Sequence, residues 1–195
     1  MTGLAIGDPP SPTNEYDYLN SRLPLLRSAV GPPLHVEGTI GGAMTHEIGD
    51  RRLEAVSMGF PISVHPLRIP NTRAQVSTAS SHSVIDFRFV RLAGLLHEMT
   101  LLRPDVDDVK LSALLGNTSI EVLGWVDVTF DALGYEFKQS CWVIRLFFPV
   151  EIQLGTDWLS AYKIKSSGAT GTGNININDA DAKKVRKLQD TYVAV

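Results

Sequence analysis

From His35 onward, the chain is divided into short runs of alternating or β-branched residues that end at turn-forming residues. The first four runs are "LHVEGTI", "RRLEAVSMGF", "ISVHPLRI" and "RAQVSTA", and Gly-Gly, Gly-Asp and Pro separate them. Alternation with a period of two places successive side chains on opposite faces of a sheet, and the turn residues keep each strand short. The sequence therefore predicts a fold built from antiparallel strands.

Similar strand patterns resume in "VKLSALLGNTSIEVLGWVDVTFDALGYEFKQSCWVIRLFF". Turn signals at Gly116-Asn117 and at Gly134 predict two hairpins there. Ahead of this stretch, "FRFVRLAGLLHEMTLL" spaces its apolar residues by three and four, which predicts a helical turn or two and then a strand. The intervening "RPDVDDV" is expected to be an acidic surface loop whose charges only interact with water.

The 195 residues favour one domain with appended segments. Residues 1–34 are rich in Pro and turn residues and are interpreted as an arm or linker with a short helix near Leu19, Leu23 and Leu26. Residues 35–165 form the predicted β domain. Residues 166–195 are interpreted as a Gly/Ser/Thr linker followed by a polar helix.

Composition argues against several classes of function. The net charge of −3 disfavours binding to nucleic acid or to an anionic membrane. The sequence has neither a signal-peptide pattern nor an apolar run of membrane-spanning length. Cys141 is the single cysteine, which excludes an internal disulfide and favours a reducing, cytoplasmic compartment. The five histidines show no metal-ligand spacing, so neither a metal nor a cofactor is expected.

Two weaker signals point to other chemistry. "GATGTGN" lacks the Lys-Ser/Thr that closes a phosphate-binding loop, and we interpret it as a flexible linker. Serines beside His82 suggest a Ser-His pair, but neighbouring side chains in a strand or tight turn are expected to point apart. No nucleophile-elbow pattern accompanies them, so serine hydrolysis is disfavoured.

Three separated segments together carry a more specific signal. They are "VSTASSHSVI" after a pair of strands, the hairpin "LLGNTSIEVLGWVDV", and "EIQLGTDWL", an apolar strand that ends at Gly before a helix. Their order and spacing resemble the retropepsin-like aspartic proteases, above all those of gypsy-type LTR retrotransposon polyproteins and the cellular proteins derived from them. The resemblance covers about residues 62–162.

The closing motif is the most specific part of the resemblance. The family's Ile-Leu-Gly-x-Asp-Trp-Leu stands here with Gln153 in place of the apolar residue, and its key positions are Leu154, Gly155, Asp157 and Trp158. For Asp157 or Thr156 we expect a helix-capping role. The resemblance implies that the flap and substrate groove comprise Leu114, Leu115, Gly116, Asn117 and Ile120.

The first motif departs from the family at its chemical centre. Ser77 stands at the position of the catalytic aspartate, Thr78 keeps a hydroxyl, and Ala79 replaces the glycine. An aspartic protease needs two carboxylates that share one proton, and in this family a homodimer supplies one from each chain. Two serine hydroxyls cannot replace them, so the resemblance implies a protease scaffold without its catalyst. Two altered positions favour natural degeneration over engineered inactivation.

The expected fold is therefore all-β: a small, closed, antiparallel retropepsin-like barrel with a flap hairpin, one short helix and flanking arms. The expected function is a non-catalytic module for homodimerisation or for binding an extended peptide. The alternative is an aspartic endopeptidase that processes a retroelement-like polyprotein and is represented here by an inactive variant.

Overall fold

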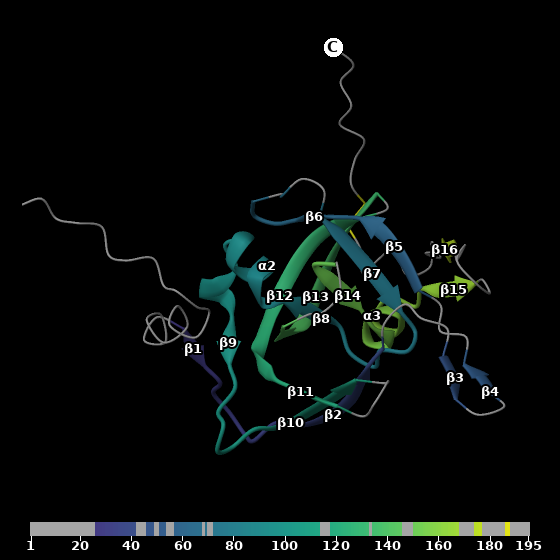
Figure 1. The fold of residues 1–195 in the computed structure, drawn as a ribbon. Helices are drawn as coiled ribbons and strands as arrows, with labels where there is room; N and C mark the ends of the chain where they lie inside the picture. The colour runs from purple at the N-terminus through teal and green to yellow at the C-terminus, as the bar shows by residue number, and fades with distance from the viewer. Residues whose placement is uncertain are drawn as a thin grey trace, which may run out of the picture.

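The protein is described by a computed structural model, in which β-strands predominate (Figure 1). The residues described are 26–41, 46–48, 51–53, 57–67, 69, 72–113, 118–132, 134–145, 150–167, 174–176 and 186–187. The all-β prediction is confirmed over these residues.

Ten strands form the main sheet. Its principal path, in spatial order, is β1 (Arg27–Ser28), β9 (Thr100–Leu101), β12 (Val122–Ala132), β13 (Tyr135–Ile144), β8 (Val84–Asp86), β14 (Ile152–Leu154), β7 (Arg73–Ser77) and β5 (Ser57–Pro61). Off this path, β6 (Ser63–Val64) pairs with β12, and β17 (Arg186–Lys187) pairs with β13.

The predicted closed antiparallel barrel is not what the described strands form. Their order runs from β1 to β5 without closing into a ring. Three of the pairs are parallel, namely β7 with β14, β8 with β13, and β1 with β9. The reason is that β14 lies between β7 and β8, so strands that follow each other in the sequence are not neighbours in the sheet.

The long hairpin of β12 and β13 is the centre of the main sheet, as its turn at Gly134 predicted. Trp125 pairs with Trp142 and Phe130 with Phe137 across the hairpin. Gly134 has a φ of +79°, a backbone conformation that glycine adopts without steric cost. Inward-facing side chains alternate along both strands, so the hairpin places one face on the core.

A second sheet of three strands carries the predicted flap. Its order is β11 (Ser119–Ile120), β10 (Asp108–Ala113) and β2 (His35–Ile40), and β2 runs parallel to β10. Two further pairs are β3 (His46–Ile48) with β4 (Arg51–Leu53) and β15 (Lys165–Ser167) with β16 (Asn174–Asn176).

The described residues contain two short α-helices. One is α3 (Thr156–Ala161), the helix predicted after Gly155. The other is α2 (Phe87–Leu92), and with the 3₁₀ turn η2 (Leu96–Glu98) and β9 it confirms the helical turn and strand predicted for residues 87–102. Asp86 caps α2, because its side chain accepts hydrogen bonds from the backbone N–H groups of Arg88 and Phe89. The N-cap of α3 is Gly155, so the prediction of Thr156 or Asp157 as the cap was wrong.

One hydrophobic core fills the space between the sheet and the helices. Trp158 is fully buried and makes aromatic contacts with Phe60, Phe137 and Tyr162. Because Trp158 belongs to α3 and Phe137 to β13, this cluster joins the closing motif to the central hairpin.

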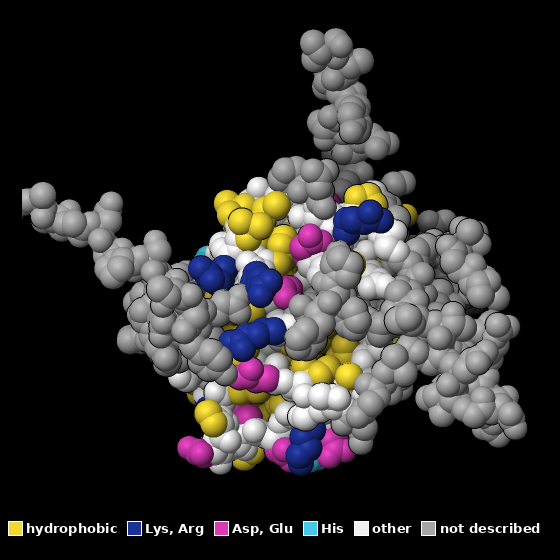
Figure 2. Space-filling view, in the orientation of Figure 1, with side chains coloured by type: hydrophobic (Ala, Val, Ile, Leu, Met, Phe, Trp, Pro, Cys, Tyr) yellow, Lys and Arg dark blue, Asp and Glu magenta, His cyan; other side chains and the backbone are white. Residues whose placement is uncertain are grey.

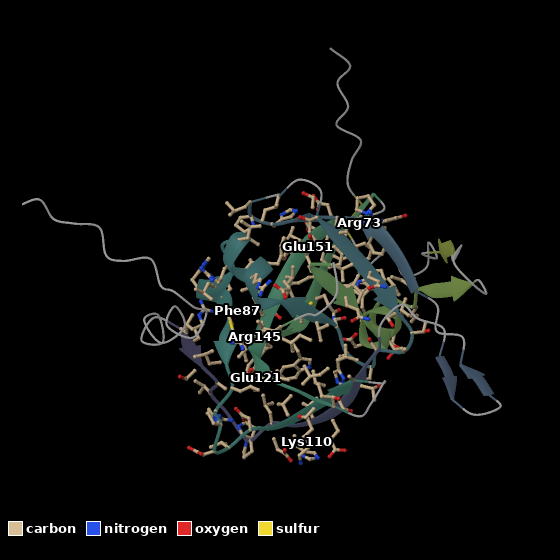
Figure 3. The ribbon with its side chains drawn as sticks, viewed as in Figure 1. Arg73, Phe87, Lys110, Glu121, Arg145 and Glu151 are labelled. Atoms are coloured by element: carbon tan, nitrogen blue, oxygen red, sulfur yellow. The ribbon has the colours of Figure 1, made fainter. Side chains whose placement is uncertain are left out.

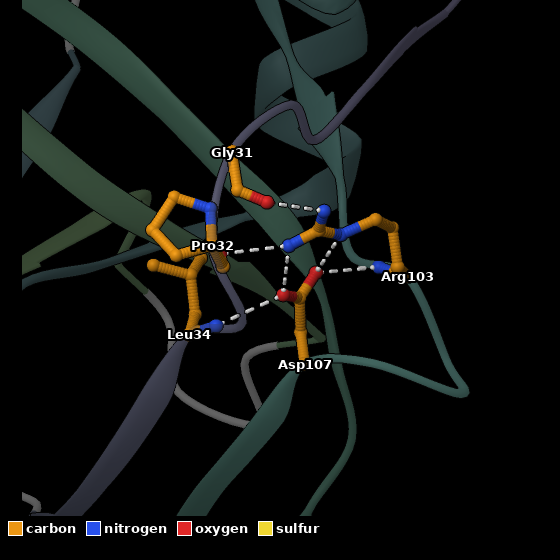
Figure 4. A network of polar contacts seen from close by, with 5 residues as sticks. All are labelled: Gly31, Pro32, Leu34, Arg103 and Asp107. Atoms are coloured by element: carbon orange, nitrogen blue, oxygen red, sulfur yellow. Dashed lines mark hydrogen bonds and ion pairs between the residues drawn. The ribbon is translucent and has the colours of Figure 1, made fainter.

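The acidic loop before β10 does more than interact with water. The side chain of Asp107 is fully buried and forms an ion pair with Arg103, with 2.7 Å between Oδ1 and Nη2 (Figure 4). Arg103 also donates to the carbonyl oxygens of Gly31 and Pro32, and Asp107 accepts from the backbone N–H of Leu34. The charges therefore fasten the segment before β2 to this loop, which corrects the prediction for "RPDVDDV".

The terminal segments contribute strands wherever they are described. Leu26 is buried, and β1 pairs with β9. At the other end, β17 pairs with β13, so residues 186–187 are a strand and not the predicted polar helix. The predicted helix around Leu19 and Leu23 lies outside the described residues.

The surface shows no single dominant charge on the face in Figure 2, where acidic and basic side chains of the described residues are interspersed. No helix in the described part of the chain has the length and apolar character needed to cross a membrane.

Candidate functional site

The loop between β7 and β8 contains the position at which the resemblance places the catalytic residue. Ser77 ends β7 and is fully buried, as is Ser80. The backbone N–H of Ser80 donates to the carbonyl of Ser77 over 3.2 Å, which closes a tight turn. Thr78 and Ala79 lie at the tip of this turn and remain partly exposed.

The Ser77 hydroxyl is engaged by the protein's own backbone. It donates to the carbonyl oxygen of Gly41 over 2.9 Å. Ser80 Oγ donates to the same oxygen over 3.2 Å, and the side-chain amide of Gln153 is a third donor to it. The Gly41 N–H in turn donates to Ser80 Oγ. The carbonyl of Gly41, the residue after β2, therefore accepts hydrogen bonds from Ser77 and Ser80 of the loop and from Gln153.

The preceding residues of β2 continue along the same loop. The N–H of Thr39 donates to Ser81 Oγ, and the N–H of Ser81 donates to the carbonyl of Thr39, both over 2.9 Å. Gly38 and Gly41 allow this close approach. A Cβ built on Gly41 would lie 2.4 Å from Cβ of Ala79, far below van der Waals contact. The segment Thr39–Gly41, which we call the covering segment, therefore covers Ser77.

Ser81 and His82 do not point apart, contrary to the sequence-based argument. Ser81 Oγ and His82 Nδ1 lie 2.8 Å from each other and share a hydrogen bond. Because the same hydroxyl also accepts from the N–H of Thr39, it fastens the covering segment to the loop. This bonding assigns Ser81 a structural role.

The closing motif packs directly against the loop. The N–H of Thr156 donates to the carbonyl of Ser80 over 2.8 Å, and the N–H of Gly155 donates to Ser83 Oγ. A Cβ on Gly155 would meet the backbone of His82 at 2.6 Å, so only glycine fits there. Leu154 lies in β14, fully buried beside Val76 of β7.

Asp157 is held in a structural network. Its carboxylate accepts from the N–H and the hydroxyl of Ser83 over 2.9 and 2.7 Å, and from the side-chain amide of Gln139 over 3.0 Å. These hydrogen bonds engage both oxygens of the carboxylate, which indicates a structural role. Asp86, the carboxylate at the end of β8, caps α2.

Gln153, the one departure in the closing motif, has a use that the sequence does not reveal. Its side chain is fully buried and its amide donates to the Gly41 carbonyl. An apolar residue at this position would leave that carbonyl one donor fewer. The only sign of this role in the sequence is a polar residue in an otherwise apolar strand.

The tip of the predicted flap, Leu114, Leu115, Gly116 and Asn117, lies outside the described residues. On either side of it, β10 and β11 pair antiparallel, as a hairpin requires. Ile120 is half-buried against a small apolar cluster of Ile40, Val84, Leu111 and Ile144. The hairpin therefore joins the covering segment's strand, β2, to the rest of the fold.

An ion pair fixes the return of this hairpin. Glu121 follows β11 and pairs with Arg145, which follows β13, over 3.5 Å (Figure 3). At the opposite end of the loop region, Glu151 accepts from the N–H of Arg73 at the start of β7 and its own carbonyl accepts from the N–H of Asp86. These contacts lie on either side of the loop, and Ser77 between them is buried.

A cavity of about 320 Å³ lies on the other side of the loop. It is lined by His82, Trp125, Gln139, Ser140, Cys141, Trp142 and Asp157. Ser77 and Ile120 do not line it, so it is distinct from the groove that the resemblance implies. Burial raises the pKa of the Cys141 thiol, with the charges of Asp157 and Asp127 adding to the effect, so this sulfur stays protonated.

Comparisons with known proteins give little further guidance. No protein-family model matches the chain, and no match is found among curated proteins. A similar solved structure is the crystal structure of the retroviral protease-like domain of Ddi1 from Leishmania major. It is 14% identical, covers 63% of this chain and 88% of that chain, and has a TM-score of 0.38.

Proposed function

We propose that this chain is a retropepsin-like domain without its catalytic carboxylate, which serves as a non-catalytic module for homodimerisation or peptide binding. The observation that carries the proposal is the position of Ser77. It lies in the loop that packs against Gly155 and Asp157, and its hydroxyl is buried against the Gly41 carbonyl. The proposal includes descent from a gypsy-type retrotransposon protease and a cytoplasmic location.

The chemistry of the loop supports the non-catalytic part of the proposal. A pair of carboxylates sharing one proton activates water and polarises the substrate carbonyl in aspartic proteases. The Ser77 hydroxyl donates to a backbone carbonyl, and no base among the described residues is hydrogen-bonded to it. Asp86 and Asp157 are committed to α2 and to Ser83. None of Ser77, Asp86 and Asp157 is therefore placed for water activation or nucleophilic attack.

The covering segment favours dimerisation over peptide binding at Ser77. A peptide that reached this residue would first have to displace Gly41 and the three hydrogen bonds that its carbonyl accepts. Thr78 and Ala79 stay partly exposed at the turn's tip with the segment in place. A second copy of the chain can therefore contact these two residues without any rearrangement.

A peptidase assay tests the absence of catalysis. We expect no cleavage of a peptide library by the natural sequence at about pH 4–6, where aspartic proteases act. The double variant Ser77→Asp, Ala79→Gly should gain activity once the covering segment yields to the new carboxylate. Circular dichroism establishes that this variant is folded. Cleavage by the natural sequence that a statine-type transition-state mimic inhibits would instead establish the endopeptidase alternative.

A further inference from the structure

Three potential metal ligands, two from the β12–β13 hairpin and one distant from it in the sequence, meet beside that hairpin. They are His65, which follows β6, Asp131 near the end of β12, and Glu136 near the start of β13. One ligand atom from each lies within 4.8 Å of the other two. Figure 1 shows β6 lying across the end of this hairpin.

The backbone holds these side chains together. Asp131 pairs in register with Glu136 across the hairpin, and with Ser63 of β6 on its other side. The N–H of His65 donates to the carbonyl of Thr129 over 2.9 Å. Directly opposed residues in adjacent strands project from the same face, so the strand register makes the two carboxylates neighbours.

This arrangement brings two carboxylates next to each other. Like charges directly opposite each other destabilise a pair of strands, and Asp131 and Glu136 are such a pair. Nε2 of His65 lies 3.0 Å from Oδ1 of Asp131, but without the geometry of a hydrogen bond. The side chains of His65 and Asp131 are only 26% and 14% exposed, so water screens their charges weakly.

We propose that His65, Asp131 and Glu136 bind a divalent transition-metal ion such as Zn²⁺. One imidazole nitrogen and two carboxylate oxygens suit zinc, and three protein ligands leave one tetrahedral position for water. The ion's charge would balance the two carboxylates. Mg²⁺ fits poorly because it prefers an octahedral shell of oxygen ligands. The proposal departs from the sequence-based prediction of no metal, which considered only local spacing and not the strand register that brings these three residues together.

The bound ion would connect β6 and the segment after it to the central hairpin. The competing interpretation is that a cation of the protein itself balances the carboxylates. His65 itself would be such a group when protonated. The two interpretations differ in whether added metal stabilises the fold.

Thermal unfolding of the full chain, freed of metal by a chelator and titrated with ZnCl₂, tests the site. At a hundredfold excess of Zn²⁺ over its Kd we expect a rise in Tm of about 5 °C, with no rise for MgCl₂. Glu136→Gln and His65→Ala should each lose most of the rise. The matched controls are Glu98→Gln and His97→Ala, which alter an exposed His–Glu pair 3.5 Å apart with no third ligand among the described residues.

Glu136→Gln keeps the shape of the side chain, so it remains informative if His65→Ala fails to fold. Isothermal titration calorimetry should give one Zn²⁺ per chain for the natural sequence and for both controls. An unchanged Tm in the presence of Zn²⁺ would overturn the proposal and favour the protein's own cations. A rise that persists in Glu136→Gln, or that disappears in His97→Ala, would also overturn it.

Discussion

At the scale of single residues, Gly41 determines the environment of the proposed degenerate site. Its carbonyl accepts from Ser77, Ser80 and Gln153, and its N–H donates to Ser80. Buried polar groups need partners, and the hydroxyls of Ser77 and Ser80 find theirs at the Gly41 carbonyl. Ser77 therefore belongs to a neutral, hydrogen-bonded cluster.

Gly41→Ala should lower the free energy of unfolding by about 1–3 kcal/mol, the usual cost of forcing extra atoms into a packed site. The new Cβ would lie 2.4 Å from Cβ of Ala79. The double variant Gly41→Ala, Ala79→Gly should recover part of the lost free energy of unfolding, because the closest contact of the new Cβ is gone. Urea unfolding of the four proteins in a double-mutant cycle measures the coupling. Strictly additive effects would show that the covering segment does not contact Ala79.

At the scale of elements, the closing motif holds the loop in position through hydrogen bonds to α3 and the strand before it. Asp157 of α3 accepts from the N–H and hydroxyl of Ser83 and from Gln139 of β13. Trp158, the next residue, anchors the same helix in the aromatic core. The helix is only six residues long, so these contacts rather than helix propensity stabilise it.

Asp157→Ala should destabilise the protein by about 2–4 kcal/mol, because it leaves the N–H and hydroxyl of Ser83 without their acceptor. Asp127→Ala is the matched control, since Asp127 accepts from exposed Ser140 on the same hairpin. Its effect should stay below about 0.5 kcal/mol. Equal losses of unfolding free energy in the two variants, measured in urea, would contradict the structural role assigned to Asp157.

Because of the ion pair between Arg103 and Asp107, we expect the stability of the protein to depend on pH in the acidic range. Hydrogen bonds from the Arg103 side chain, and then from the N–H groups of Arg103 and Leu34, hold the pKa of Asp107 well below its usual range. A lowered folded-state pKa contributes stability above the unfolded value of about 3.9 and loses it as pH falls further. The natural sequence should therefore have a higher Tm than Asp107→Asn. This difference in Tm should be constant near neutral pH and should shrink below about pH 4.

Asp105→Asn is the control for this experiment, because Asp105 is exposed in the same loop. Its Tm should follow that of the natural sequence across the titration. A difference between the natural sequence and Asp107→Asn that grew as the pH fell would have the wrong sign for a stabilised carboxylate.

At the scale of the whole molecule, the question is whether two copies meet at the turn's tip. Thr78 and Ala79 are the partly exposed residues there, and Cys141, the chain's only cysteine, is buried and stays protonated. A cysteine introduced at Thr78 would therefore be the only reactive thiol in the chain.

Thr78→Cys should form a disulfide-linked dimer under mild oxidation if the proposed dimer brings the two turns together. Disulfides require Cα atoms closer than about 7 Å, so cross-linking reports direct apposition. Lys110→Cys, at an exposed position on β10, should remain monomeric in the same reaction. Sedimentation of the natural sequence gives an independent readout. A strict monomer at high concentration, together with no cross-linked product from the Thr78→Cys variant, would contradict dimerisation.

The sequence by itself determined the strand-rich class, the hairpin at Gly134, and the absence of a carboxylate at Ser77–Ala79. Each of these depends on local patterning or on residue identity, which neighbouring residues do not alter. Tertiary structure decided that β14 lies between β7 and β8, that Gly41 covers Ser77, and that His65 meets Asp131 and Glu136. These outcomes depend on the pairing of strands far apart in the chain. No local periodicity encodes that pairing, because the whole core selects it by the side chains that it buries.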